Sequence, residues 1–158
     1  MMVKKQEKKK ITVVVSGGFD PVHVGHIRMF NEAKKLGHKL IVLINNDNWL
    51  LAKKGYVFMS EKERVEIIES FSAVDEVRLT SHSKNTIDRS VCTDLEKIKP
   101  DIFANGGDRF KKNIPEVALC QKIKCKLVFN VGDGGKIQSS SWLIDKAKKV
   151  NKKIFLKK

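Results

Sequence analysis

Five short apolar runs divide this 158-residue sequence, and stretches with helical spacing of apolar residues separate them. The runs are rich in β-branched residues, and glycine or polar loops follow them, as is usual for buried strands. We expect strands over residues 11–16, 39–45, 74–80, 101–105 and 126–131. Strands that alternate with helices form a parallel sheet with helices on both faces. The pattern therefore predicts an α/β domain with a Rossmann-like five-stranded parallel sheet.

Capping residues and prolines set the expected helix boundaries. Gly37 closes the first helix in the usual C-terminal position. Ser60 and Glu63 form a capping box, and Pro115 suits the first residue of a helix. The expected helices cover residues 25–36, 48–53, 60–71, 93–98, 115–124 and 140–150, with irregular loops at 81–90 and 132–138.

Positive charge is concentrated at the two ends of the chain. Of the net charge of +14, residues 1–10 carry +4, residues 146–158 carry +7 and residues 11–145 only +3. Lysine-rich ends suit contact with polyanions and equally suit a solvated surface. We expect a basic N-terminal tail (1–10), one domain (11–150) and a basic C-terminal tail (151–158). The weakly charged body argues against a dedicated nucleic-acid-binding module.

The cysteines and the apolar runs indicate in which cellular compartment the protein is found. Three cysteines without a CxxC pair argue against a disulfide framework and a structural zinc site, so we expect reduced, partly buried thiols. No segment approaches the roughly 20 apolar residues of a membrane span. The apolar run at 11–15 is too short for a signal peptide. We expect a cytoplasmic protein without a membrane partner.

Two loops are expected to form the ligand site. In Rossmann-type order, ligands bind at the carboxyl ends of the strands, where the order switches between strands one and four. The loops that meet there are GGFDPVHVGH (17–26) and NGGDR (105–109). Gly17 and Gly18 let a phosphate approach the backbone closely, and the following helix points its free N–H groups at the same space. Neither a GxGxxG fingerprint nor a P-loop is present.

Two histidines, His23 and His26, stand where this helix begins. Their i, i+3 spacing puts both rings on one face, and Gly25 leaves room between them. Imidazoles at a helix N-terminus donate hydrogen bonds to phosphate oxygens and can take up charge as it builds. Zinc binding would need a third ligand, and none is evident. The pair therefore indicates a phosphate site.

The segment GGFDPVHVGH strongly resembles the HxGH signature of the nucleotidyltransferase superfamily of cytidylyl- and adenylyltransferases. The resemblance extends over about residues 12–145. Its further motifs are NNDNWLLAKKG (45–55), with a phosphate-binding lysine, ERVEIIESFSAVDEV (63–77), with a substrate-side arginine, GGDR (106–109), and IQSSSWLI (137–144), an ISTT-type signature.

The resemblance implies a reaction between a nucleoside triphosphate and a phosphorylated small molecule, with release of pyrophosphate. A phosphate monoester is largely ionised at neutral pH, since its second pKa is about 6. No general base or covalent intermediate is needed, and positioning and charge stabilisation carry the rate. Mg²⁺ bound through the triphosphate is implied, without direct side-chain ligation. The resemblance also allows a homodimer.

The resemblance assigns roles to residues of three kinds. The expected catalytic residues are His23, His26, Lys53 and Arg109. The expected nucleotide-binding residues are Gly17, Gly18, Phe19, Asp20, Gly25, Asn105, Gly106, Gly107, Asp108, Ser139, Ser140 and Ser141. The expected substrate-binding residues are Asn46, Asp47, Trp49, Lys54 and Arg64. Either Lys53 or Lys54 would bridge the phosphates, Asp20 would fix the turn or contact the ligand, and Arg64 would bind a substrate phosphate or lie on the surface.

The acceptor is harder to predict. Where cytidylyltransferases of the glycerol-phosphate type carry an RTEGIST-like run, this chain has GDGGKIQ, including Lys136. The GGD loop and the glycine-containing loop look more like the heptose 1-phosphate adenylyltransferase branch. We therefore favour ATP with a sugar or polyol phosphate. The alternatives are CTP with a polyol or alcohol phosphate, and then an adenylyltransferase for flavin mononucleotide (FMN) or pantetheine phosphate.

Two other classes of protein are less consistent with the sequence. An aminoacyl-tRNA synthetase shares the histidine signature, but the chain is too short for an anticodon-binding part. A basic nucleic-acid-binding module would explain the lysine-rich ends, but it would not explain the histidine pair or the three serines.

Overall fold

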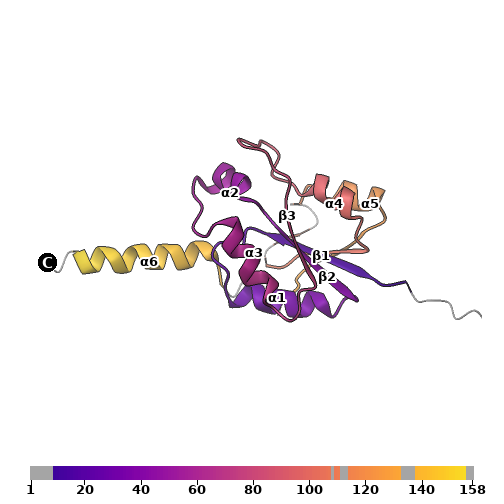
Figure 1. Cartoon of the computed structure of the whole chain (residues 1–158), viewed down its shortest axis with the longest axis horizontal. Helices are drawn as coiled ribbons and strands as arrows, with labels where there is room; N and C mark the ends of the chain where they lie inside the picture. Colours follow the sequence, from indigo (N-terminus) through magenta and orange to yellow (C-terminus); the bar gives the residue numbers. More distant parts are fainter. Residues whose placement is uncertain (1–8, 108, 111–113, 133–137, 156–158) are drawn as a thin grey trace, which may run out of the picture.

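The structure, a computed structural model, describes residues 9–107, 109–110, 114–132 and 138–155. Its described strands form one parallel sheet in the order β3-β2-β1-β4-β5 (Figure 1). They are β1 (Thr12–Gly17), β2 (Lys39–Ile44), β3 (Glu76–Leu79), β4 (Ile102–Ala104) and β5 (Lys126–Val128). The predicted α/β fold is confirmed, and the strand order switches between β1 and β4 as expected.

The helices lie close to their predicted positions. They are α1 (Val24–Lys34), α2 (Asp47–Lys54), α3 (Glu61–Glu69), α4 (Cys92–Ile98), α5 (Val117–Lys122) and α6 (Ser140–Phe155). Apart from the end of α6, each helix boundary lies within two residues of its predicted position. Helix α5 begins only after a turn at Pro115. Helix α6 continues beyond residue 150 into the segment that we expected to be a tail.

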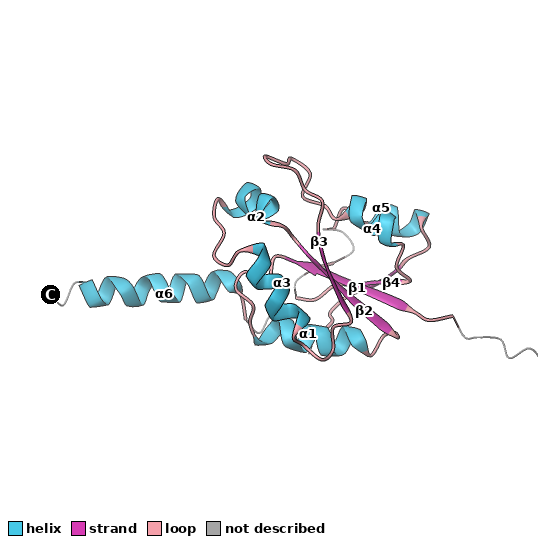
Figure 2. Cartoon of the chain, viewed as in Figure 1, coloured by secondary structure: helices cyan, strands magenta, loops and turns pink. Residues whose placement is uncertain are grey.

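Two layers of helices cover the sheet (Figure 2). Successive strand residues point to opposite faces, so Val13 and Val15 belong to one core cluster and Val14 to the other. The first cluster is completed by α1 and α3, and the second by α4 and α5. Both layers leave the carboxyl ends of β1, β2 and β4 facing a common space.

Gly37 does not cap α1 as predicted. The helix ends at Lys34, and its C-cap residue is Lys35 in the right-handed region. A Cβ atom on Gly37 would lie 2.7 Å from a methyl carbon of Val13 and 2.8 Å from the carbonyl oxygen of Ile11. Glycine is needed here because the turn after α1 packs directly against the start of β1.

The three thiols are free, and none of them is fully exposed. Cys92 is half-buried, whereas Cys120 and Cys125 are buried. Burial raises the pKa of all three, that of Cys125 to about 12. The predicted burial of the thiols is confirmed, and their reduced state stays a prediction. Within the described residues, none of the helices has the length and apolar character required to cross a bilayer.

Candidate active site

A cavity of about 280 Å³ opens at the carboxyl ends of β1, β2 and β4. The predicted ligand position at the switch in strand order thus coincides with a hollow in the structure. Most of the predicted site residues line it: Gly17, Gly18, Phe19, His23, Gly25, His26, Trp49, Lys53, Lys54, Asn105, Gly106, Gly107, Arg109, Ser139, Ser140 and Ser141. Asp20, Asn46, Asp47 and Arg64 do not line it. Asp108 and Lys136 lie outside the described residues.

The two histidines stack at the beginning of α1, with ring centroids 3.7 Å apart. His23 is the N-cap, and its Nδ1 accepts the backbone N–H of Gly25 at 3.1 Å. Nδ1 of His26 accepts the backbone N–H of His23 at 3.2 Å. A ring nitrogen that accepts a hydrogen bond carries no proton, so each neutral ring holds its proton on Nε2. Capping the helix therefore leaves each ring with an N–H that can donate to a ligand.

His26 is neutral in this environment. Burial, the neighbouring His23 ring and the Lys54 ammonium together lower the pKa of His26 from 6.5 to about 3. The sequence suggested an imidazole that takes up charge, whereas the geometry describes a neutral donor. A neutral N–H donates to a phosphate oxygen without first having to bind a proton.

The loop after β1 folds back on itself. Phe19 has a positive φ of 51°, and its ring meets His26 edge-on with centroids 4.9 Å apart. A Cβ atom on Gly17 would lie 2.9 Å from the Phe19 ring. Gly17 is therefore required because the phenylalanine that supports His26 occupies the space where a side chain would be.

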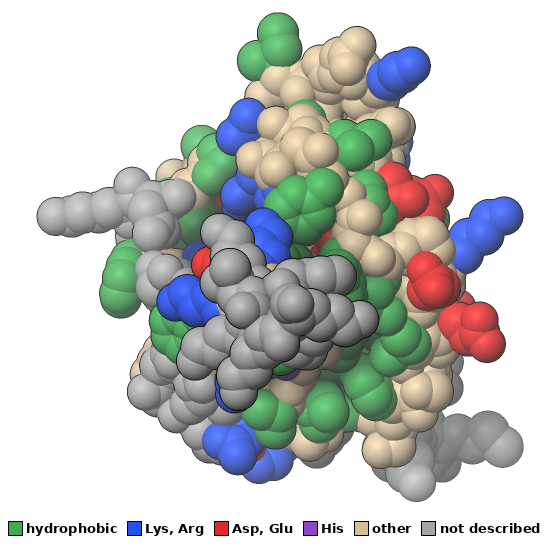
Figure 3. All heavy atoms as spheres, turned by 90° about the vertical axis from the view of Figure 1, so that its left-hand side faces the viewer, with side chains coloured by type: hydrophobic (Ala, Val, Ile, Leu, Met, Phe, Trp, Pro, Cys, Tyr) green, Lys and Arg blue, Asp and Glu red, His purple; other side chains and the backbone are tan. Residues whose placement is uncertain are grey.

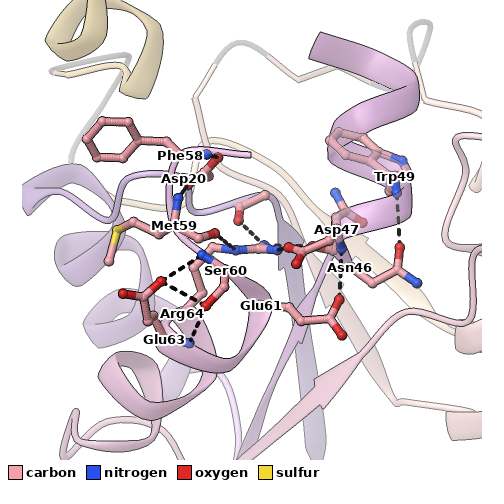
Figure 4. Close-up of polar contacts among 12 residues, drawn as sticks. Asp20, Asn46, Asp47, Trp49, Phe58, Met59, Ser60, Glu61, Glu63 and Arg64 are labelled. Carbon is pink, nitrogen blue, oxygen red and sulfur yellow. Dashed lines mark hydrogen bonds and ion pairs between the residues drawn. The ribbon is translucent and has the colours of Figure 1, made fainter. Parts of the chain in front are cut away.

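Asp20 holds the backbone behind the cavity in place. The sequence analysis placed it with the nucleotide-binding residues, or as the residue that fixes the turn. Its side chain is fully buried and accepts the backbone N–H groups of Phe58 and Met59 at 2.8 and 2.6 Å (Figure 4). Asp20 thus ties the loop after β1 to the segment that leads into α3, and the structure favours the structural role.

Arg64 lies in the interior, neither on the surface nor at the cavity wall. Its side chain is fully buried and donates to the backbone carbonyls of Gly18, Asn45 and Met59 at 2.7–3.0 Å. It also pairs with the carboxylate of Asp47 at 2.6 Å (Figure 4). These contacts use the guanidinium to hold three loops together. The substrate-phosphate role that the sequence suggested stays a prediction, and the structure places the guanidinium away from the cavity.

Asn46 and Asp47 also serve the local structure. Oδ1 of Asn46 caps α2 by accepting the backbone N–H of Trp49 at 3.0 Å, and its Nδ2 donates to the carbonyl of His82. Asp47 is held by Arg64, and its backbone N–H donates to Glu61 at 2.9 Å. Both residues fix the position of α2, and neither side chain reaches the cavity.

Helix α2 provides two lysines to the wall of the cavity. Nζ of Lys53 lies 4.5 Å from the ring centroid of Trp49. Nζ of Lys54 lies 3.4 Å from the carbonyl oxygen of Asp20. Burial lowers the pKa of Lys54; the Asp20 carboxylate opposes this effect and Arg64 adds to it. Both lysines line the cavity, so the geometry leaves open which of them bridges the phosphates.

Two helix N-termini converge on the cavity. Ser140, the first residue of α6, donates from its hydroxyl to the carbonyl of Pro21, just before α1, at 2.8 Å. The free N–H groups and positive dipole ends of both helices therefore lie near the same space. Ser139, Ser140 and Ser141 form this wall, and Arg109 lies on the side of the loop after β4. The described lining residues include no acidic side chain, so the cavity suits a polyanion.

One lining residue that the sequence analysis missed is Asn45. It directly follows β2 and is 2% exposed, and its Oδ1 atom has no hydrogen-bond partner among the described residues. The sequence offered a signal, because Asn45 is the first polar residue after the apolar run of a predicted strand. Met29 and Gln138 also line the cavity without having been predicted.

The sheet order and a donor-rich cavity at the switch point define a nucleotide-binding α/β protein. A family model for cytidylyltransferase-like proteins matches residues 14–150, and the chain belongs to this family. The prediction of a nucleotidyltransferase is thereby confirmed.

Relatives with assigned names support the same class. The chain is 37% identical over 124 residues to an FAD synthase of Thermococcus sibiricus, covering 76% of each protein. It is 32% identical over 148 residues to an FAD synthase of Methanobrevibacter smithii, covering 88% of this chain and 92% of the relative. A solved structure from Thermoplasma volcanium, a lipopolysaccharide core biosynthesis protein, is 29% identical. It superposes with a TM-score of 0.61 over 77% of this chain and 97% of its own.

Proposed function

We propose that the chain is an FMN adenylyltransferase, which transfers AMP from ATP to the phosphate of FMN and forms FAD and pyrophosphate. The observation that carries this proposal is the similarity, over most of both chains, to proteins named FAD synthase. The sequence analysis ranked a sugar or polyol phosphate first and FMN third. The names of these relatives favour FMN.

The chemistry is an in-line displacement at the α-phosphorus of ATP. An oxygen of the FMN phosphate forms the new P–O bond, and the bond to the oxygen that bridges the α- and β-phosphates breaks. The FMN phosphate is already ionised at neutral pH, so it needs no base. The protein must align the two phosphates and stabilise negative charge on the departing pyrophosphate.

The lining residues supply groups for both tasks. We assign the Nε2–H groups of His23 and His26 to the triphosphate at the start of α1. Ser139, Ser140 and Ser141 receive the β- and γ-phosphates at the start of α6. Arg109 and the lysines of α2 supply positive charge on opposite sides of the cavity.

Mg²⁺ enters this scheme bound to the triphosphate. The donor set fits such an arrangement, since the described lining side chains include histidines, lysines, an arginine and serines that can donate to phosphate oxygens, and phosphate oxygens are hard ligands that suit Mg²⁺. The ion supplies charge neutralisation when it is bound. We further propose a cytoplasmic location, where a reaction that consumes ATP finds its substrate. The homodimer stays a prediction.

A substrate panel tests the proposal. Pyrophosphate release is measured with ATP or CTP against FMN, a sugar 1-phosphate, a polyol phosphate and pantetheine phosphate, and FAD is identified by chromatography. The expected result is release with ATP and FMN. Release only with a sugar or polyol phosphate would overturn the FMN assignment while preserving the nucleotidyltransferase. That arm matters because the Thermoplasma neighbour is described as a lipopolysaccharide core biosynthesis protein.

Variants at the histidines test the site. His26→Ala removes one donor to the transition state, and such a loss typically lowers kcat about 10²- to 10³-fold. His38→Ala is the matched control, because His38 lies at the opposite end of the sheet, where its Nδ1 accepts the backbone N–H of Ile11. Turnover of His26→Ala at the rate of the control would remove the pair from the mechanism.

A further inference from the structure

Helix α6 projects from the body of the protein (Figure 1). Its first turns are anchored to the body, because the Ser140 hydroxyl bonds to Pro21 and Ile144 is buried at 8% exposure. Every side chain from Asp145 to Asn151 is exposed. A helix gains most of its stability in a protein from packing an amphipathic face against a neighbour. A helix that projects this far from the body therefore indicates that α6 packs against a surface outside this chain.

The exposed part of α6 has two distinct faces. A rotation of 100° per residue places the exposed Ala147 and Val150 on one face, which continues the half-buried Leu143. Lys148 and Lys149 fall on the opposite face. Nζ of Lys148 lies 6.0 Å from the ring centroid of Tyr56 on the body, so the basic face touches the body at this point. The apolar face points elsewhere, and Val150 on it is 50% exposed.

The charge of α6 narrows the choice of partner. Residues 146–158 hold seven lysines and no acidic residue. Pairing two copies of α6 along their apolar faces would bring like charges together, because Lys146 lies four residues before Val150 and borders that face. A nucleic acid would neutralise the lysines but would leave the apolar face in water. An anionic lipid surface engages both faces, because the apolar side enters the acyl boundary while the lysines meet the headgroups.

The surface of the body next to α6 also combines exposed aromatic side chains with basic ones. Tyr56 and Phe58, in the segment between α2 and α3, are 36% and 60% exposed, and Trp142 at the start of α6 is 53% exposed. Viewed from the side on which α6 projects, hydrophobic and basic side chains lie close together (Figure 3). Acidic side chains gather toward one margin of the same view.

We propose that α6 binds in the plane of an anionic phospholipid surface and holds the enzyme there as a peripheral protein. This revises the expectation from sequence that no membrane takes part. The contact lies on the surface of the bilayer and does not cross it. The proposal is independent of which acceptor the enzyme uses.

Vesicle binding of the full chain tests the proposal. Sedimentation is measured with vesicles of phosphatidylglycerol and, separately, of phosphatidylcholine. We expect binding to the anionic vesicles and little to the neutral ones. Val150→Asp places a charge on the apolar face, and Lys149→Glu reverses a charge on the basic face. Each charge near such a surface contributes about 1 kcal/mol, so the reversal in Lys149→Glu is expected to weaken binding about thirtyfold, and the charge added by Val150→Asp is expected to weaken it at least about fivefold.

The matched control is Lys84→Glu, the same charge reversal at an exposed residue in the loop between β3 and α4. It is expected to bind as the wild type does, and pyrophosphate release in solution is expected to be the same for all variants. Three results would overturn the proposal. These are no binding to anionic vesicles, an equal loss in Lys84→Glu, or a Val150→Asp variant that binds normally. A stable dimer that Val150→Asp dissociates would assign α6 to a second copy instead, and RNA binding that survives this substitution would assign it to nucleic acid.

Discussion

His23 and His26 use their two ring nitrogens for different purposes. In each ring Nδ1 accepts a backbone N–H at the start of α1, which leaves the proton on Nε2. Histidine is uncommon as an N-cap, where serine, threonine, aspartate and asparagine are preferred. Its use here makes sense if the residue that caps the helix must also present a donor to a phosphate.

The low pKa of His26 makes stability depend on pH. In the folded chain His26 has a pKa of about 3, against 6.5 when it is solvated. Above pH 6.5 the ring is neutral in both states and there is no penalty. As the pH falls from 6.5 toward 3, the unfolded chain binds the proton more readily, so the free energy of unfolding decreases. Between pH 6.5 and pH 5 the loss is about 2 kcal/mol.

This dependence is measured by urea denaturation of the wild type and of His26→Asn at both pH values. We expect the variant, which cannot bind the proton, to lose about 2 kcal/mol less than the wild type over this range. Equal losses in the two proteins would mean that His26 titrates normally when folded.

Asn45 illustrates a conflict between stability and ligand binding. Its buried Oδ1 has no partner among the described residues, and an unsatisfied buried group costs about 1–3 kcal/mol. Asn45→Leu, which is similar in size, is expected to raise the free energy of unfolding by about 1 kcal/mol. If a substrate donates to Oδ1, the same variant will raise the KM for that substrate. Denaturation and steady-state kinetics measure the two effects, and a less stable variant would contradict the first.

Helix α3 and the loops around it form a braced unit. Arg64 links the loop after β1, the end of β2 and the start of α2 from a single position on α3 (Figure 4). Asp20 adds a second tie from the loop after β1 to the segment before α3. The walls of the cavity are thus fixed from inside the protein.

Substitutions of Arg64 and of Arg109 test whether the contacts of Arg64 stabilise the fold. Arg64→Leu leaves the half-buried Asp47 carboxylate and three backbone carbonyls without their donor, and it is expected to lower the free energy of unfolding by about 3–5 kcal/mol. Arg109→Leu changes a residue at the cavity wall and is expected to keep stability within about 0.5 kcal/mol while turnover falls. Thermal denaturation and pyrophosphate release separate the two variants. A stable, inactive Arg64→Leu would return this residue to substrate binding.

The sequence predicted what short-range patterns encode. The capping box of Ser60 and Glu63 marks the start of α3, and the i, i+3 spacing brings His23 and His26 onto one face. The sequence did not reveal that Arg64 points inward, since that depends on carbonyls from three distant loops. One signal was present, because Arg64 stands four residues before the buried Ile68 and so shares its face. The extension of α6 was missed because the lysine-rich sequence after residue 150 is equally typical of a tail and of the solvated face of a helix.

At the scale of the whole molecule, the short edge strand β5 lies next to two buried thiols, those of Cys120 and Cys125. Strand β5 has only three residues and follows Cys125, which packs with Cys120 against the second face of the sheet. Their raised pKa values and burial make these two thiols poor nucleophiles as long as this edge is closed. Cys92, half-buried at the start of α4, is the most accessible of the three.

Thiol labelling with a disulfide reagent therefore reports on the integrity of the fold. In native buffer we expect one thiol per chain, Cys92, to react first, while Cys120 and Cys125 react only in denaturant. The Cys92→Ser variant is expected to abolish the early phase. Rapid native labelling of all three thiols would show that the β5 edge opens locally without global unfolding.

The internal brace has a consequence for redesign. Because Arg64 and Asp20 fix the backbone without reaching the cavity, the residues that hold this part of the scaffold are separate from those that line the cavity. Changes at Lys53 and Arg109, which line the cavity, can then be combined in a library without removing the contacts that Arg64 and Asp20 make. A chain built in this way is a convenient starting point for enzymes that attach nucleotides to new phosphates.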